Sequence, residues 1–109
     1  RLGAARALHE RYGATVVLKG AGTVVCATGE IPSICDRGNP GMAVAGMGDV
    51  LTGVIAALLA QGATGPTAAR AGVWLHAVAG DRASLAGERG LLASDLCESL
   101  RTLVNPRGD

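Results

Sequence analysis

Residues 38–53 read Gly-Asn-Pro-Gly-Met-Ala-Val-Ala-Gly-Met-Gly-Asp-Val-Leu-Thr-Gly, a glycine-rich turn that runs into the start of an apolar helix. Gly46 and Gly48 carry no side chain that would block a ligand, and the first N–H groups of a helix lack intrahelical acceptors. Such N–H groups, at the positive end of the helix, bind phosphate and other anions. The stretch therefore predicts a phosphate-binding loop at Gly46, Met47 and Gly48.

A carboxylate, Asp49, follows this loop directly. A negative charge beside an anion site weakens the binding of phosphate alone, so its presence favours a chemical role, such as taking a proton from an attacking hydroxyl. Aspartate is also a common helix N-cap residue, and glycine-rich loops are common turns. From the Gly-x-Gly-Asp pattern alone, both a catalytic base and a structural cap remain open.

The whole run of sixteen residues resembles the signature of the carbohydrate kinase-like NAD(P)H-hydrate dehydratases, members of the ribokinase-like superfamily. Three further blocks resemble the same family in the same order, at residues 16–25, 75–81 and 90–95. Two positions depart from the family pattern: Arg37, where a small or hydroxyl residue is expected, and Ala77, where glycine is more usual. The resemblance implies an α/β fold, namely the carboxy-terminal part of a ribokinase-like three-layer α/β/α domain.

The resemblance also implies roles for individual residues. Asp49 would bind the substrate and act as the catalytic base, while N–H groups of the loop stabilise the transferring phosphoryl group. For Asn39, stabilising the turn and ordering phosphate or its magnesium are both open. No residue is assigned as a metal ligand. The nucleotide-binding set is Lys19, Gly20, Ala21, Gly22, Thr23 and Gly48.

The activity that the resemblance implies is the repair of hydrated NADH and NADPH. ADP or ATP, with Mg²⁺, would phosphorylate the ring hydroxyl, and phosphate would then be eliminated; resemblance to bacterial members favours ADP. Two alternatives stay open, a small-molecule kinase of the same superfamily and a truncated, non-catalytic nucleotide-binding module. The Asn-Pro-Gly-Met segment at residues 39–42 favours the dehydratase over the kinase.

Composition argues against a nucleic-acid partner. The chain is 49% hydrophobic and 17% charged with a formal net charge of +1, and only Tyr12 and Trp74 could stack on a base. Arg1, Arg6 and Arg11 are expected on a solvated helix face. The three cysteines form no Cys-x-x-Cys pair and are odd in number, which suits reduced thiols in a cytoplasmic protein.

Hydrophobic spacing predicts alternating helices and strands in one piece of chain. The helix from Asp49 is apolar on every side and is therefore expected to be buried nearly all round. Its apolar run, residues 50–60, is about half the ~20 residues that a membrane span needs. The other expected elements are a helix over residues 2–12, strands over 15–18, 23–28 and 31–34, a helix over 66–85, and a helix from Ser94 as N-cap to 105.

The length of the chain limits how much of the domain it can contain. The resemblance implies a domain more than twice as long, so residues 1–109 are expected to be the carboxy-terminal portion of a single domain. We expect a homo-oligomer, or association with the missing amino-terminal half. His76 is expected to be a core histidine and Asp81 a local partner or a brace of the loop. Both stay outside the catalytic set.

Overall fold

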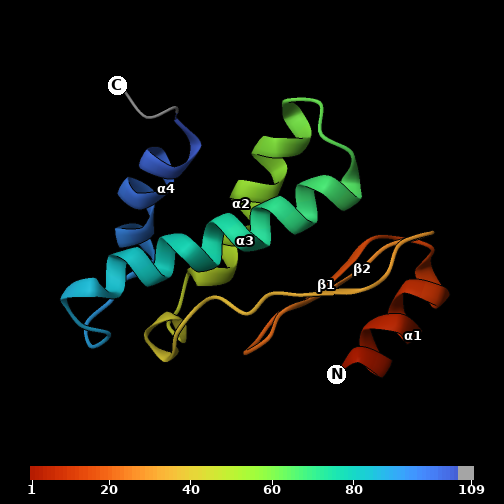
Figure 1. Cartoon of the computed structure of the whole chain (residues 1–109), viewed down its shortest axis with the longest axis horizontal. Coiled ribbons are helices and arrows are strands. Elements are labelled where there is room, and N and C mark those ends of the chain that lie inside the picture. The colour runs from red at the N-terminus through yellow and green to blue at the C-terminus, as the bar shows by residue number, and fades with distance from the viewer. Residues whose placement is uncertain (106–109) are drawn as a thin grey trace.

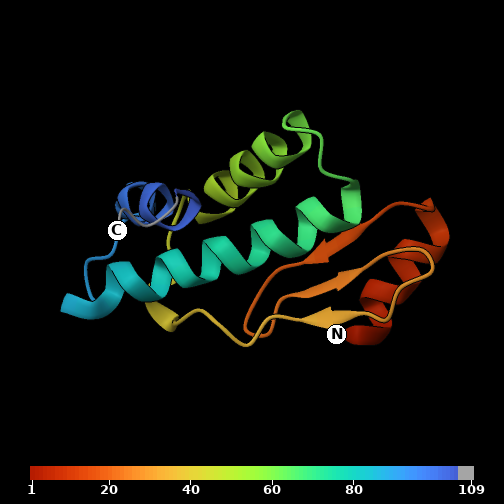
Figure 2. The same cartoon turned by 45° about the horizontal axis from the view of Figure 1, so that its top comes forward.

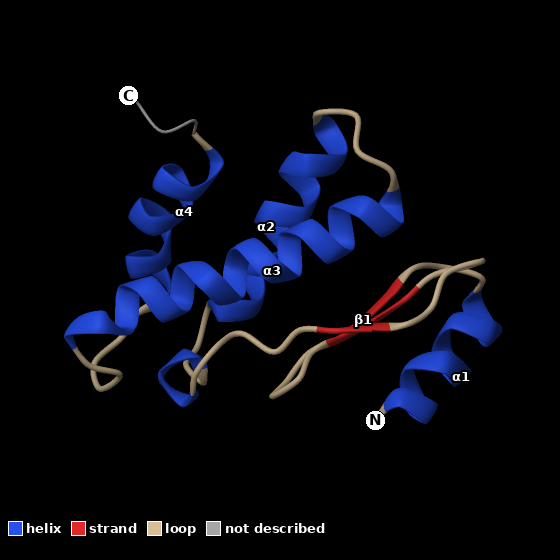
Figure 3. Ribbon diagram, viewed as in Figure 1, coloured by secondary structure: helices blue, strands red, loops and turns tan. Residues whose placement is uncertain are grey.

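The computed structural model describes residues 1–105 and forms one small sheet with helices on both of its faces (Figure 1). Figure 3 shows the strands and the first helix on one side of the molecule and the remaining helices on the other. The α-helices and strands of the described residues are α1 (Leu2–Tyr12), β1 (Val16–Leu18), β2 (Val24–Cys26), β3 (Ser33–Ile34), α2 (Met47–Ala60), α3 (Gly65–Ala83) and α4 (Leu96–Val104). Short 3-10 helices lie at η1 (Pro40–Met42), η2 (Ser84–Ala86) and η3 (Ala93–Asp95).

The first helix ends at a glycine. Gly13 adopts a left-handed conformation, with φ at 63°, and its N–H donates to the His9 carbonyl at 2.8 Å. A residue without a Cβ has no steric penalty in that conformation, which is why glycine so often closes a helix. The predicted helix over residues 2–12 is confirmed.

The three strands pair in chain order, β1-β2-β3, and both pairs are antiparallel (Figure 2). In the central strand, Val25 lies opposite Val17 of β1 and Ser33 of β3. All three strands exist as predicted but are shorter than expected. Pro32 precedes β3, and because proline has no N–H to donate, pairing with β2 begins only at the next residue.

The central strand is buried on both faces. Val24 packs with Ala5 of α1, whereas Val25 packs with Leu51 of α2 and Val73 of α3. Successive side chains of a strand point to opposite faces, so one helix layer covers each face of the sheet. The order α1, sheet, α2–α3 is a three-layer α/β/α arrangement, as Figure 2 shows, and confirms the predicted fold class.

The expectation that α2 is buried nearly all round is wrong. Within this helix only Met47 and Leu51 are buried, and its outer face, which includes Leu59, is exposed. On its inner face α2 crosses α3 closely, since a Cβ built on Gly72 would lie 2.6 Å from Cγ1 of Ile55. The described residues supply a neighbour for one side of this apolar helix and leave the other side in water.

The last two helices follow the predicted order with shifted starts. Thr64 caps α3, its hydroxyl accepting from the Thr67 N–H, and the predicted helix over 66–85 corresponds to α3 with η2. The expectation that Ser94 caps the final helix is wrong. Ser94 lies inside η3, where the Asp95 carboxylate instead accepts from the Leu92 N–H at 2.8 Å. The helix α4 begins at Leu96.

The structure can be compared with the dimensions of a bilayer. At 1.5 Å per residue the 14 residues of α2 extend about 21 Å, less than the ~30 Å of a hydrocarbon core. The longer α3 carries Arg70, Asp81 and Arg82. No helix among residues 1–105 has both the length and the apolar character that spanning a membrane requires.

Candidate active site

The glycine-rich loop reaches the start of α2 without a side-chain cap. Gly46 is the N-cap and has a positive φ of 90°, which favours glycine. Its carbonyl accepts the first helical bond, from the Val50 N–H at 3.1 Å. The N–H groups of Gly48 and Asp49 have no acceptor within residues 1–105. The N–H of Met47, in contrast, donates to the Val44 carbonyl at 3.5 Å. The helix therefore presents the free donors of Gly48 and Asp49 at its positive end, where an anion can bind.

The ammonium group of Lys19 lies against these donors. Lys19 directly follows β1, and a Cβ built on Gly48 would collide with its Nζ atom. A cation at the amino end of a helix is electrostatically unfavourable in isolation. Two sources of positive potential placed together form a site that an anion would stabilise. The packing of β1 beside α2 thus brings together two of the residues that the sequence assigned to one nucleotide.

The turn between β1 and β2 is held by a side chain that sequence analysis placed in solvent. The Arg1 guanidinium donates to the carbonyls of Leu18 and Lys19 at 3.4 Å and of Gly22 at 3.3 Å. Within the turn, the Thr23 hydroxyl donates to the Gly20 carbonyl at 3.0 Å. Arg1 therefore shapes the turn that carries the predicted nucleotide-binding residues. Helical periodicity alone could not show this contact, because the turn is distant in sequence.

Asp49 is not a helix cap. It is the third residue of α2, it is exposed, and its side chain makes no hydrogen bond within the described residues. Gly46 occupies the N-cap position instead, so the structural alternative for this carboxylate does not hold. A carboxylate in the first turn is favoured by the helix dipole. Asp49 is therefore an exposed acceptor without a hydrogen bond among residues 1–105, and it directly follows Gly48, where the Lys19 ammonium group lies.

Asn39 and Asp81 together close the turn that precedes the loop. The Asp81 carboxylate accepts from the Gly38 N–H at 3.0 Å and from Nδ2 of Asn39 at 2.9 Å. Oδ1 of Asn39 accepts from the Gly41 N–H at 3.0 Å and from the Ser84 hydroxyl at 3.2 Å. These contacts favour the turn-stabilising role of Asn39. They also show Asp81 bracing the loop from α3, one of the two roles that the sequence left open.

Replacing Asp81 tests this brace. Asp81→Ala leaves the Gly38 N–H and the Asn39 amide without their acceptor, and we expect it to lower the free energy of unfolding by about 1–3 kcal/mol. Urea denaturation followed by circular dichroism measures the change. Asp36→Ala is the matched control, because Asp36 is exposed and pairs only with the neighbouring Arg37. Equal stability of the two variants would contradict a bracing role for Asp81.

His76, five positions before Asp81 on α3, also contacts the glycine-rich loop. Its Nε2 atom lies 3.0 Å from the Met47 carbonyl, and because a carbonyl only accepts, Nε2 carries the proton. Burial lowers the pKa of His76, the hydrogen bond to the Met47 carbonyl partly opposes this, and the Lys19 charge adds a smaller lowering. The pKa therefore lies below its ordinary 6.5, which favours the neutral ring at pH 7. His76 thus has a hydrogen-bond partner inside the protein, as expected for a core histidine. Sequence analysis missed the identity of the partner.

Two methionines fix the loop to the core. Met47 is buried with Ala79 and Leu96, and Met42 packs so closely on α3 that a Cβ on Gly80 would collide with its sulfur. The thioether of methionine adapts to such irregular surfaces. The loop is therefore held on its inner side while the N–H groups of Gly48 and Asp49 remain free.

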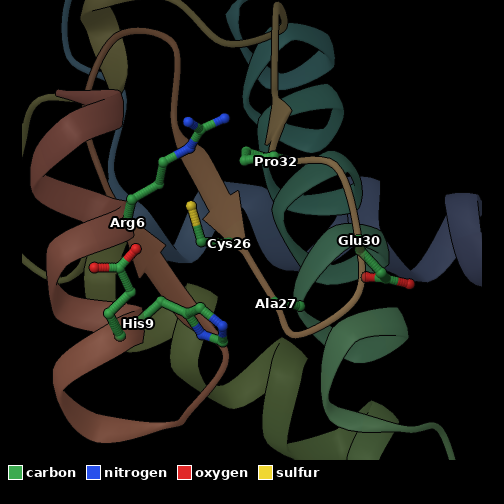
Figure 4. Close-up of a pocket in the computed structure, with 7 residues that line it drawn as sticks. Arg6, His9, Cys26, Ala27, Glu30 and Pro32 are labelled. Carbon is green, nitrogen blue, oxygen red and sulfur yellow. The ribbon is translucent and has the colours of Figure 1, made fainter.

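Two cavities lie away from the glycine-rich loop. One of about 270 Å³ lies between α1 and the segment that joins β2 to β3, lined by residues that include Arg6, Cys26 and Glu30 (Figure 4). His9 also lines it and is already bonded to the Ala14 carbonyl at 2.6 Å. A second cavity, of about 170 Å³, lies beside Trp74. Neither is lined by a predicted site residue, and Lys19 and Asp49 are both exposed.

No metal-binding cluster is present in the described part of the chain. No three His, Cys, Asp or Glu side chains within residues 1–105 come together in a way that could hold an ion. Cys26, Cys35 and Cys97 are all free thiols. Mg²⁺ usually binds through one or two carboxylates and the phosphates of a nucleotide. The surface at Asp49 fits an ion that arrives with a nucleotide better than a resident metal.

Comparison with protein families gives a match over almost the whole chain. A family model described as NAD(P)H-hydrate dehydratase matches residues 1–102. The bifunctional NAD(P)H-hydrate repair enzyme of Vibrio cholerae is 58% identical over 106 residues. The ADP-dependent (S)-NAD(P)H-hydrate dehydratase of Neisseria meningitidis is 44% identical over 107 residues.

A solved structure has the same fold. The ADP/ATP-dependent NAD(P)H-hydrate dehydratase from Bacillus subtilis, co-crystallised with ATP and Mg²⁺, superimposes with a TM-score of 0.85 at 26% sequence identity. The match covers 93% of the present chain and 37% of the Bacillus chain. The chain likewise spans 21% of the Vibrio relative and 36% of the Neisseria relative.

Proposed function

Because this chain belongs to the NAD(P)H-hydrate dehydratase family, we propose that it carries the phosphoryl-transfer site of an ADP-dependent dehydratase that repairs hydrated NADH and NADPH. One observation carries the proposal. The Lys19 ammonium group lies at Gly48, whose N–H is free, and the next residue of α2, Asp49, carries an exposed carboxylate without a hydrogen bond among residues 1–105. This combination offers positive potential for a phosphate and, beside it, an acceptor for a proton. The ADP dependence is supported by the name of the Neisseria relative.

Each group has a role in this proposal. The nucleotide is bound by the segment from Lys19 to Thr23 and by Gly48. The positive charge of Lys19 interacts with the negative charge of the phosphates. The loop of Gly46, Met47 and Gly48 stabilises the charge on the transferring phosphoryl group. Asp49 binds the substrate and takes the proton of its ring hydroxyl. Asn39 holds the turn, and we assign it no direct contact with phosphate.

The reaction proceeds in two stages. The hydroxyl oxygen on the reduced nicotinamide ring attacks the terminal phosphoryl group of the nucleotide, while Asp49 takes the hydroxyl proton. A new O–P bond forms, the P–O bond to the nucleotide breaks, and AMP leaves if ADP is the donor. Mg²⁺, which enters with the nucleotide as part of that substrate, neutralises phosphate charge. Asp49 is therefore needed in the first stage.

Elimination follows from the chemistry of the phosphorylated ring. Hydroxide is a poor leaving group, whereas phosphate is a good one. The lone pair of the ring nitrogen expels phosphate, the C–O bond breaks, and loss of a proton from the adjacent carbon restores the double bond of the dihydropyridine. A kinase-type site thereby produces a lyase reaction.

We also propose that residues 1–109 form the carboxy-terminal portion of a larger single domain. The support is that the chain spans 36% of the Neisseria relative and leaves the apolar outer face of α2 in water. An exposed apolar face favours association, so we expect either a homo-oligomer or contact with the amino-terminal half of the domain. The three free thiols support a cytoplasmic location.

The second candidate function is a non-catalytic nucleotide-binding module. The observation that favours it is that Lys19 and Asp49 are exposed and line neither of the two cavities described above. A small-molecule kinase would use the same loop and Asp49 on a different alcohol. These candidates differ in what they turn over, which one assay distinguishes.

The assay mixes hydrated NADH with the protein, Mg²⁺ and either ADP or ATP, and follows the absorbance of the reduced nicotinamide. We expect the absorbance to recover, and to recover faster with ADP. In a second mixture, where a sugar replaces hydrated NADH as the phosphoryl acceptor, release of AMP from ADP together with no recovery from the hydrate would favour a kinase that acts on another alcohol. Nucleotide binding without any turnover, in a folded protein, would favour the binding module and contradict the proposed dehydratase.

A further inference from the structure

His76 lies where it can control the direction of one peptide group in the phosphate loop. It is on α3, half-buried, and its Nε2–H donates to the Met47 carbonyl at 3.0 Å. The two residues are 29 positions apart in the chain, so this bond is purely tertiary. On its other side, Met47 is buried against Ala79 and Leu96. As the first residue of α2, Met47 also offers this carbonyl to the helical bond from the Leu51 N–H, so the His76 bond is a second constraint on the carbonyl, together with the packing of the Met47 side chain.

The planarity of the peptide bond transmits this constraint. The Met47 carbonyl and the Gly48 N–H belong to the same peptide unit, and the structure contains no cis peptide bond within the described residues. In a trans unit the C=O and N–H point in opposite directions. Fixing the carbonyl toward His76 therefore fixes the Gly48 N–H away from α3. That N–H and the N–H of Asp49 both lack an acceptor within residues 1–105.

We propose that His76 is a positioning residue that aims the Gly48 N–H at the phosphoryl group during transfer. The inference rests on the proposed function, and it deepens the role of the loop. His76 touches neither nucleotide nor substrate in this proposal, because it acts through the Met47–Gly48 peptide. A donor aimed in advance at developing charge stabilises a transition state without reorganisation, which is why direction matters.

The neighbourhood of His76 suits this role. Burial lowers the pKa of His76 by more than the hydrogen bond to Met47 raises it, and the Lys19 charge lowers it further, so the neutral ring is favoured. A neutral ring donates its one N–H to the Met47 carbonyl and adds no second cation beside Lys19. The charge that attracts phosphate therefore remains on Lys19, and the imidazole supplies geometry alone.

Two substitutions separate donation from packing. His76→Gln can place an amide N–H near the position of Nε2, whereas His76→Leu fills the space without a donor. Arg82→Gln, an exposed change on the same helix, is the control. Using the intact protein, we expect His76→Leu to lower kcat roughly 10-fold or more with at most about a twofold change in the KM for ADP. We expect His76→Gln to recover most of kcat and Arg82→Gln to match the wild type.

A second readout does not need turnover. In ¹H–¹⁵N spectra, addition of ADP and Mg²⁺ is expected to shift the Gly48 amide resonance in the wild type and in His76→Gln, and much less in His76→Leu. If the wild type shows no dehydratase activity, the proposed function fails while this resonance still decides the role of His76. An equal Gly48 shift in His76→Leu, no shift in the wild type, or an unchanged kcat in His76→Leu would overturn the proposal. Thermal unfolding of all four proteins shows whether any variant has lost its fold.

Discussion

Asp49→Asn is expected to reduce the turnover of hydrated NADH by roughly 10²–10⁴-fold, the usual contribution of a positioned general base. Asparagine keeps the size of the side chain but cannot accept the hydroxyl proton. Because the Asp49 side chain makes no hydrogen bond within the described residues, the substitution breaks no contact of the fold. Recovery of reduced-nicotinamide absorbance gives the rate, and titration with ADP shows that nucleotide binding persists.

Glu98→Gln is the matched control for this variant. Glu98 is the third residue of α4, as Asp49 is of α2, and it is also exposed. Both substitutions remove a carboxylate from the first turn of a helix and so lose a similar interaction with the helix dipole, typically about 0.3–1 kcal/mol. We expect similar melting temperatures and a loss of turnover in Asp49→Asn alone. Near wild-type turnover by Asp49→Asn would remove the carboxylate from the mechanism.

Gly48→Ala is expected to weaken the binding of ADP with Mg²⁺ by roughly 10–100-fold, the equivalent of one hydrogen bond to a charged group. The added Cβ would occupy the position of the Lys19 ammonium group. Because Nζ is the far end of a flexible side chain, Lys19 moves away and the backbone does not. The variant therefore separates the ammonium group from the helix start. Isothermal titration with ADP measures the loss.

The stability of Gly48→Ala should move in the opposite direction to its affinity. Gly48 is inside α2 and has no positive φ, and alanine in a helix is favoured over glycine by roughly 0.5–1 kcal/mol. Gly3→Ala is the matched control, since Gly3 is likewise the second residue of its helix and a Cβ there meets nothing within 4 Å. Both variants should melt at or above the wild-type temperature, and only Gly48→Ala should lose affinity. Undiminished ADP binding by Gly48→Ala would argue that Lys19 does not hold the nucleotide.

The patterns that sequence predicts well here are those set by local geometry. The helix stop at Gly13, the proline before β3 and the order of helices and strands all follow from backbone preferences within a few residues. The wrong predictions concern features that depend on contacts outside the local sequence pattern. The burial of α2 was overestimated because an apolar helix is covered only if neighbours exist, and the described residues cover one side. Asp95, and not Ser94, is the residue at the N-cap of α4, while the Asp95 carboxylate accepts from the Leu92 N–H at the start of η3.

In the candidate site, too, some features follow from the local sequence and others only from tertiary contacts. The glycines of residues 38–53 by themselves determined a loop that enters a helix with free N–H groups, because those features depend on φ and on the unpaired donors of any helix start. Only the tertiary structure decided that Lys19 lies on Gly48, that His76 holds the Met47 carbonyl, and that Asp81 braces the preceding turn. These contacts join residues about 30 or more positions apart. They exist because β1 and α3 pack beside the start of α2, and no local preference of the chain specifies that packing.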